Sequence, residues 1–229
     1  MPDPAPHALV TGVSSGIGAA VVERLLGRGW RVTGLSRSAP PPRDGLEWIE
    51  ADLSDPSSVP GVVAGVGALD AVVHAAGLQR TGRLGALDPA AGEHMWRVHV
   101  AAAAELAGAL LDRIADGGRI VLIGSRTAGG SPGKSQYAAT KAALEAMARS
   151  WAAELVGRRI TVNVVAPGPT DTPMLADPGR AATPPIVPPL GRRVRPGEVA
   201  ALVELLVGPD GGAITGQTIT VCAGMSLPR

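Results

Sequence analysis

The chain has 229 residues, a formal net charge of +1 at pH 7 and 45% hydrophobic residues. This length suits one large domain, which we expect over residues 1–229, and the lone Cys222 excludes an internal disulfide. Near-neutral charge with few aromatic residues argues against a nucleic-acid surface, and no apolar run approaches the ~20 residues of a membrane span. Without a signal-like start, we expect a cytoplasmic protein.

Short apolar runs alternate with longer helical patterns along the chain. The apolar runs lie at 7–12, 30–36, 46–52, 69–77, 119–125, 160–168 and 217–222. The helical patterns lie near 16–28, 57–66, 91–115, 135–157 and 196–207. This alternation predicts an α/β fold of Rossmann type, a doubly wound parallel sheet of about seven strands with helices on both faces. Ligands bind such sheets at the carboxyl ends of the strands.

A glycine-rich turn, TGVSSGIG (11–18), joins the first strand to the first helix. Glycines in such a turn let the backbone approach a pyrophosphate, and the helix N-terminus adds amide donors. The spacing departs from G-x-G-x-x-G, and a tight turn without a ligand would also use glycine. Its place in the first strand-helix unit favours nucleotide binding by Gly12, Ser14, Ser15, Gly16, Ile17 and Gly18.

The end of the second strand indicates which cofactor is bound. Ser36 stands where an acidic residue would accept a hydrogen bond from a free ribose 2′-hydroxyl, and Arg37 follows it. A guanidinium can bind a 2′-phosphate, which favours NADP(H) over NAD(H), although a solvated arginine is the plainer interpretation. Further on, Asp52 and Leu53 are candidates for contacts with the adenine, with Asp52 alternatively capping a helix.

The stretch SQYAATKAAL (135–144) holds the only tyrosine, Tyr137, and one of only two lysines, Lys141. Residues four apart share a helix face, so Lys141 lies one turn beyond Tyr137. A nearby ammonium favours the phenolate, and a compact ammonium suits this task better than a guanidinium. The alternative is an exposed helix face. Ser125 closes the fifth strand, where its hydroxyl can donate to a substrate carbonyl or merely satisfy a turn.

The chain resembles the short-chain dehydrogenase/reductases, in particular their 3-oxoacyl-carrier-protein-reductase-like branch. The resemblance covers nearly the whole chain. It rests on TGVSSGIG, HAAG (74–77), GS (124–125), YAATK (137–141), NVVAPGPTDTPM (163–174), PLGRRVRPGEVAALVELL and ITGQTITV.

The resemblance implies roles for individual residues. Tyr137 would be the general acid-base, Ser125 would position the carbonyl, and Lys141 would bind ribose and tune the phenol. A substrate lid would lie near 174–195. The loop after the sixth strand would curl round the nicotinamide. Further cofactor contacts would come from Ala75, Ala76 and Gly77, and from Pro167, Gly168, Thr170 and Thr172 of this loop.

Two residues depart from the family pattern. His74 replaces the first asparagine of the usual NNAG or NAAG motif, and we expect it to be structural. His99 takes the place of an asparagine whose main-chain carbonyl holds a water of the proton relay. It is a candidate proton shuttle, and the alternative is a neutral, hydrogen-bonded interior residue.

The leading interpretation is an NADPH-dependent reductase of a small-molecule ketone, with no metal and a homotetrameric or homodimeric assembly. Segments LDAVVHAAGLQRTGRL and PGPTDTPML also resemble the NAD-dependent 2,3-dihydro-2,3-dihydroxybenzoate dehydrogenases, which makes an alcohol or dihydrodiol dehydrogenase the alternative. A catalytically silent nucleotide-binding sensor is a third hypothesis, of another class. The sequence does not identify the substrate.

Overall fold

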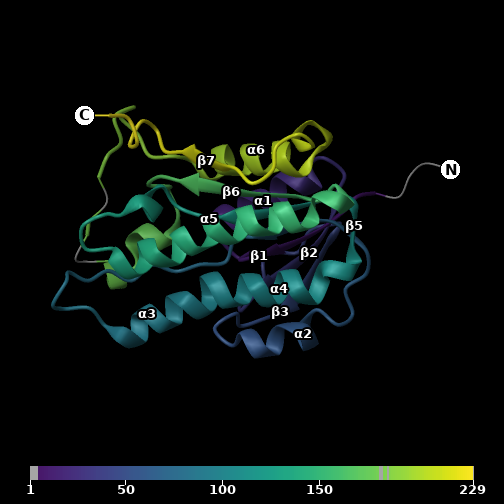
Figure 1. Ribbon diagram of the computed structural model, residues 1–229, viewed down its shortest axis with the longest axis horizontal. Coiled ribbons are helices and arrows are strands. Elements are labelled where there is room, and N and C mark those ends of the chain that lie inside the picture. Colours follow the sequence, from purple (N-terminus) through teal and green to yellow (C-terminus); the bar gives the residue numbers. More distant parts are fainter. Residues whose placement is uncertain (1–4, 181–182, 185, 229) are drawn as a thin grey trace.

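The computed structural model describes residues 5–180, 183–184 and 186–228. Its centre is a parallel sheet of seven strands in the order β3-β2-β1-β4-β5-β6-β7 (Figure 1). This topology confirms the predicted Rossmann-type sheet. The strands are β1 His7–Thr11, β2 Arg31–Ser36, β3 Leu46–Glu50, β4 Leu69–His74, β5 Ile114–Ile123, β6 Thr161–Pro167 and β7 Thr218–Val221.

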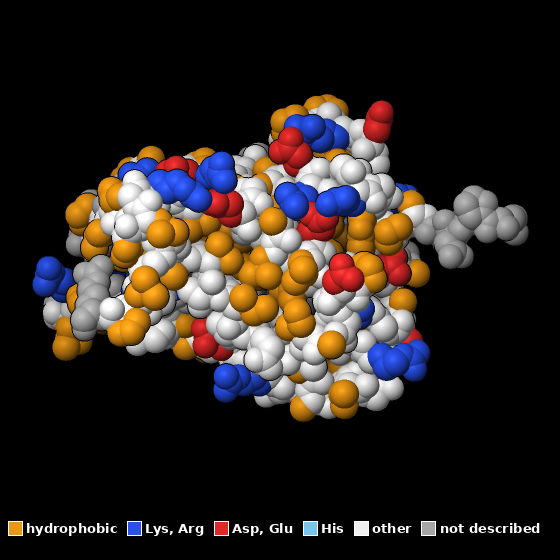
Figure 2. All heavy atoms as spheres, turned by 90° about the horizontal axis from the view of Figure 1, so that it is seen from above, with side chains coloured by type: hydrophobic (Ala, Val, Ile, Leu, Met, Phe, Trp, Pro, Cys, Tyr) orange, Lys and Arg blue, Asp and Glu red, His pale blue; other side chains and the backbone are white. Residues whose placement is uncertain are grey.

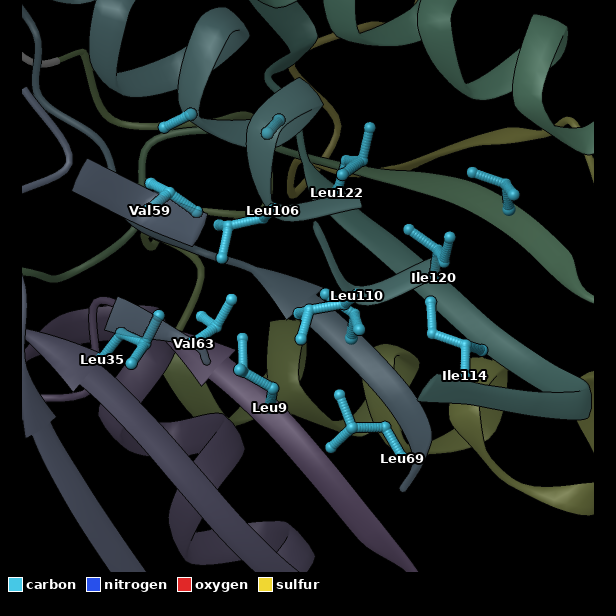
Figure 3. Close-up of a cluster of buried hydrophobic side chains, with 14 of the residues drawn as sticks. Leu9, Leu35, Val59, Val63, Leu69, Leu106, Leu110, Ile114, Ile120 and Leu122 are labelled. Atoms are coloured by element: carbon cyan, nitrogen blue, oxygen red, sulfur yellow. The ribbon is translucent and has the colours of Figure 1, made fainter. Parts of the chain in front are cut away.

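Helices cover both faces of this sheet, as expected for strands that are apolar on both sides. On one face lie α1 (Gly16–Leu26) and α6 (Pro196–Val207), which pack their valines and leucines against alternate residues of β1, β4 and β5. On the other lie α2 (Val59–Val62), α4 (Ala102–Leu110) and α5 (Ser135–Leu155). Figure 3 shows this second core, where Leu106 and Leu110 lie close to Leu9 and Val63.

The order of the strands places the functional crevice. β1 pairs with β2 on one side and with β4 on the other. The chain therefore adds β2 and β3 to one side of β1, and then β4 to β7 to its other side. The loops that follow β1 and β4 therefore diverge to opposite faces and leave a crevice beyond their carboxyl ends. The predicted Gly-rich turn and the HAAG motif lie at these two ends.

The segment predicted as one helix over 91–115 is divided. α3 (Pro89–Trp96) leads into a π-helical turn, Arg97–Ala101, and then into α4. β5 begins at Ile114, within the predicted helix. Such π turns loosen the regular backbone ladder and occur frequently at functional sites. Here the carbonyl of Val98, within the turn, accepts a hydrogen bond from the buried ring of His74.

The surface seen from above in Figure 2 carries basic side chains beside acidic ones, with apolar side chains between them. Arg24 and Arg28 of α1 both pair with Glu204 of α6, which joins these two helices. Exposed pairs of this kind contribute up to about 1 kcal/mol each. Within the described ranges, none of the helices combines the length and the apolar character that crossing a bilayer requires.

Candidate active site

A cleft of about 510 Å³ opens at the carboxyl ends of the strands, at the switch between β1 and β4. All of the residues proposed from the sequence for cofactor binding or catalysis line it. They are Gly12, Ser14, Ser15, Gly16, Ile17, Gly18, Ser36, Arg37, Asp52, Leu53, Ala75, Ala76, Gly77, His99, Ser125, Tyr137, Lys141, Pro167, Gly168, Thr170 and Thr172.

The glycine-rich turn provides a cradle at one end of the cleft. A Cβ atom on Gly18 would lie 2.2 Å from the carbonyl oxygen of Gly12, so only glycine allows α1 to approach β1 this closely. Gly16 has a φ of +59°, which side chains disfavour. Ser15, the N-cap of α1, makes no side-chain capping bond. The amide groups of the first helical turn therefore remain available to an anionic ligand.

A second loop closes over this cradle. A Cβ atom on Gly16 would lie 3.2 Å from Cγ2 of Thr172, so the loop after β6 packs directly against the start of α1. Thr170 holds this loop, because it donates to the carbonyl of Gly168 at 3.0 Å and forms a bridge with Val194. The space between the turn and this loop suits a dinucleotide.

The residues at the end of β2 suit a ribose 2′-phosphate better than a free ribose 2′-hydroxyl. The hydroxyl of Ser36 donates to the Ser38 carbonyl at 2.8 Å and accepts from Nε1 of Trp48 at 3.1 Å. Arg37 is exposed at the rim of the cleft, and its charge helps to lower the pKa of Asp52. The larger cause of that lowering is a hydrogen bond from the Ser54 amide, at 2.9 Å, to Asp52 itself. Asp52 thus caps a turn at the adenine end of the cleft.

His74 joins β1 to β4 and to the π-helical turn. Oγ1 of Thr11 accepts the amides of Ala75 and Ala76 at 3.0 and 2.9 Å, which leaves its own proton for Nδ1 of His74 at 3.1 Å. Nε2 of His74 must then carry the ring proton, which it donates to the Val98 carbonyl at 3.1 Å. Burial, reinforced by the charge of Lys141, lowers the pKa of His74 to about 4. His74 is therefore a neutral link between three elements.

His99 is fully buried beside the catalytic candidates. Thr140 donates its hydroxyl proton to the Tyr137 carbonyl at 2.8 Å, so Nδ1 of His99 donates to Thr140 at 2.8 Å. Nε2 accepts the Leu78 amide at 3.0 Å. Burial, with the charge of Lys141, holds the pKa of His99 well below 6.5. This geometry fits the neutral interior residue, and it leaves no free nitrogen for the proton shuttle considered from the sequence.

Tyr137 and Lys141 lie on one side of α5 and face the cleft. Nζ of Lys141 lies 5.8 Å from the centre of the Tyr137 ring and donates to the Ile123 carbonyl at 2.9 Å. Burial lowers the pKa of Lys141 to about 7. Burial also raises the pKa of Tyr137 above 10, while the Ser125 hydroxyl and the charge of Arg180 oppose that rise. In the protein alone, the cation that lowers the pKa of the phenol is thus Arg180.

Ser125 stands at the end of β5 with its hydroxyl directed by its neighbours. It accepts the amide of Thr127 at 3.2 Å and lies 2.9 Å from the Thr127 hydroxyl. When Thr127 donates, the proton of Ser125 is free for the phenol oxygen or for a substrate carbonyl. The structure therefore brings Ser125, Tyr137 and Lys141 to one point of the cleft.

The reacting end of the cleft also holds charged residues that were not among the predicted site residues. Arg180 is only 6% exposed. Lys134 also lines the cleft, and its pKa is lowered mainly by burial and further by the charges of Arg180 and Arg126. Arg80 pairs with Asp177 at 2.9 Å. Lys134 could have been predicted from its closeness to Tyr137 in the sequence. Arg180 could not, because it belongs to an irregular Pro-rich loop and no local sequence pattern indicates how that loop packs.

The fold and the cleft define an NAD(P)-dependent oxidoreductase. The family model described as Enoyl-(Acyl carrier protein) reductase matches residues 12–226. The 3-oxoacyl-acyl-carrier-protein reductase FabG of Salmonella typhimurium is 34% identical over 96% of this chain and 97% of its own. The cyclic-di-GMP-binding biofilm dispersal mediator protein of Escherichia coli is 34% identical over 93% and 94%. A blue fluorescent protein from a metagenomic library, solved with NADPH, is 34% identical over 96% and 98%, with a TM-score of 0.85. The chain belongs to the short-chain dehydrogenase/reductase family.

Proposed function

We propose that this protein is an NADPH-dependent reductase that converts a ketone into an alcohol. The observation that carries the proposal is the convergence of Ser125, Tyr137 and Lys141 in the same cleft as the glycine-rich turn. Buried polar side chains that gather at a crevice with shifted pKa values are typical of reaction centres. The FabG relatives, which are named as reductases of a 3-oxoacyl group, support the same class of reaction.

The cofactor is NADP(H). Two similar solved structures contain NADPH, the metagenomic blue fluorescent protein and BdcA. The cleft of this chain fits such a group, because the amides at the start of α1 are uncapped and the close approach of Gly18 to Gly12 leaves a cradle that a Cβ atom would fill. We assign Arg37 to the 2′-phosphate, since no carboxylate stands at Ser36 to repel it. Ala75 to Gly77, and the loop of Thr170 and Thr172, would line the rest.

Each polar residue at the reacting centre has a distinct task in this proposal. When bound, the reduced nicotinamide supplies a hydride. Tyr137 holds a proton, because burial raises its pKa, and delivers it to the carbonyl oxygen. Ser125 donates a hydrogen bond to the same oxygen and orients it. Lys141 restores positive charge near the phenol when it is protonated, which its pKa of about 7 permits at neutral pH.

His74 and His99 are positioning residues in this account. Their rings are neutral, and both nitrogens of each are hydrogen-bonded. His74 binds the Val98 carbonyl of the π-helical turn, and His99 supports the start of α5 through Thr140. In this role they hold Lys141 and Tyr137 in place.

A nucleotide-binding regulator is the second candidate. The Escherichia coli relative named for binding cyclic di-GMP is as similar in sequence as the FabG proteins. Against this stands the complete Ser125, Tyr137 and Lys141 set, which a silent binding protein does not need. Steady-state reduction of a panel of ketones decides between the two, since a regulator would show no turnover with any of them.

We also propose that residues 1–229 form one catalytic domain, with the segment near 174–195 as its lid, of which 181–182 and 185 lie outside the described residues. Leu175 and Arg180 of this segment line the cleft, which supports the assignment. Assembly into a homotetramer or homodimer is supported by large apolar side chains left exposed on helices, namely Trp96 of α3 and Leu205 of α6.

Fluorescence titration with NADPH and NADH, followed by the ketone panel with both, tests the proposed function. We expect tighter binding of NADPH and turnover of at least one ketone. Tighter binding of NADH would overturn the assignment of Arg37 and favour the alcohol or dihydrodiol dehydrogenase instead.

A further inference from the structure

Arg180 is a buried arginine at the reacting end of the cleft. It closes the short turn Pro178–Arg180 and is 6% exposed. Arg180 lines the cleft together with Tyr137, and its charge lowers the pKa of the Tyr137 phenol. Arginine is almost never this buried unless it is paired, because removing its charge from water is costly. Its location therefore requires a partner.

Among the described residues, few groups accept hydrogen bonds from the Arg180 guanidinium. The guanidinium has five N–H donors, and its one hydrogen bond to a described residue is a long one, from Nη1 to the Met174 carbonyl at 3.5 Å. Nε of Arg180 is fully buried and has no hydrogen-bond partner within 5–180, 183–184 and 186–228. The nearby carboxylate of Asp177 is occupied, since it accepts from Arg80 at 2.9 Å and from the Gly179 amide at 2.8 Å.

The surroundings of Arg180 are strongly positive. Lys134 and Arg126 lie near it, and the Nε atom of Arg126 is likewise buried without a partner among the described residues. Asp177, already paired with Arg80, is the acidic residue that lines this end of the cleft. Several cations thus face one shared carboxylate. A ligand with a negative charge would offset this imbalance and fill the open donors.

We propose that the ketone substrate carries a carboxylate that binds Arg180, with Lys134 as a second cation, so that the enzyme reduces a short oxo acid to a hydroxy acid. This inference rests on the proposed function. Hydride passes from the reduced nicotinamide to the ketone carbon, and the phenol proton of Tyr137 passes to its oxygen. The products are the hydroxy acid, the oxidised cofactor and the Tyr137 phenolate, which then takes up a proton from solvent. A planar carboxylate matches the two parallel donors of a guanidinium.

The closeness of Arg180 to Tyr137 limits the length of the substrate. Because Arg180 and Tyr137 line the same cleft, we expect a short spacer between the carboxylate and the reacting ketone. A carrier-bound substrate would place its phosphate at the far end of a long pantetheine arm, well away from this pocket. The bound carboxylate would also offset the charge that lowers the pKa of the phenol, which helps Tyr137 to keep its proton until the hydride arrives.

Matched acid and ester substrates test this inference directly. The pairs are acetoacetate with methyl acetoacetate, and 4-oxopentanoate with its methyl ester, each measured with NADPH. We expect kcat/KM to be about 10- to 100-fold higher for the acid than for its ester in the wild-type protein, the range of a charged hydrogen bond. Arg180→Met should abolish that ratio by lowering the rate far more with the acid than with the ester, and Arg180→Lys should restore part of it. Arg83→Met, an exposed arginine outside the cleft, is the matched control.

Equal kcat/KM for acid and ester in the wild-type protein would overturn the inference, as would an equal loss for both in Arg180→Met. Calorimetry with butanoate, which has no ketone, separates this result from a failure of the proposed function. With NADP⁺-saturated protein, butanoate should bind the wild type and bind Arg180→Met at least tenfold more weakly. Such binding without turnover of any ketone would refute the proposed reductase function and still support the carboxylate site. Equal or absent binding would sink the site.

Discussion

Lys141 lies one helical turn beyond Tyr137 on α5, with its Nζ atom 5.8 Å from the centre of the phenol ring and 2.9 Å from the Ile123 carbonyl. In the protein alone, burial dominates both groups, since it raises the pKa of Tyr137 and lowers that of Lys141 to about 7. The pair thus begins as a protonated phenol above a partly neutral amine.

The buried amine of Lys141 should make stability depend on pH. Unfolding returns the amine to its ordinary pKa of 10.5, so between pH 7 and pH 10 the unfolded chain binds more protons than the folded one. The free energy of unfolding should therefore rise with pH, with a limiting slope of about 1.4 kcal/mol per unit from this group. Urea unfolding of the cofactor-free protein between pH 7 and 9.5 measures the slope. Lys141→Met should flatten it, and identical slopes in the two proteins would refute the prediction.

His74 should act on stability at lower pH. Its pKa is about 4 when folded and 6.5 when unfolded, so the unfolded chain binds the extra proton first as the pH falls. The folded protein should lose about 2 kcal/mol from this residue between pH 7 and pH 5. His74→Asn has no ring to protonate. In urea unfolding, its free energy of unfolding should therefore fall by about 2 kcal/mol less than that of the wild type between pH 7 and pH 5. The prediction fails if both proteins lose the same amount.

Gly18 should tolerate no side chain. A Cβ atom there would lie 2.2 Å from the Gly12 carbonyl, so Gly18→Ala must push α1 away from β1. We expect a loss of about 1–3 kcal/mol in the free energy of unfolding, together with weaker NADPH binding, because the amide cradle moves. Gly61→Ala is the control, since nothing lies within 4 Å of its added Cβ atom. If Gly18→Ala kept wild-type stability, the close approach of the helix would be disproved.

Arg37 should set the cofactor preference. Replacing it with serine removes the proposed partner of the 2′-phosphate, so the Kd for NADPH should rise about 10- to 100-fold while that for NADH stays nearly constant. Arg43→Ser, in an arginine close in sequence that lies outside the cleft, should change neither Kd. Fluorescence titration of the two cofactors measures both values. A parallel loss of NADPH and NADH affinity would show that Arg37 acts on something other than the phosphate.

The strands and the main helices were predictable because their signals are local. Runs such as HALVT are buried on both faces, and their apolar continuity is visible in the sequence. The site residues were predictable as a set, since the turn, the tyrosine and the lysine have fixed spacings. The break in the helix over 91–115 was not, because it accompanies the bond from His74, on another strand, to the Val98 carbonyl. Arg180 was missed for the same reason, since its burial depends on how an irregular loop folds over the cleft.

Substitution of Tyr137 with phenylalanine tests the central claim most directly, because it removes one oxygen and keeps the ring. Single-turnover reduction of an accepted ketone and fluorescence titration of NADPH should be measured on the same preparation. The account predicts a fall in the rate of at least about 100-fold, the usual contribution of a general acid, with NADPH affinity within a few-fold of the wild type. A variant that still reduces the ketone at a rate near that of the wild type would contradict it.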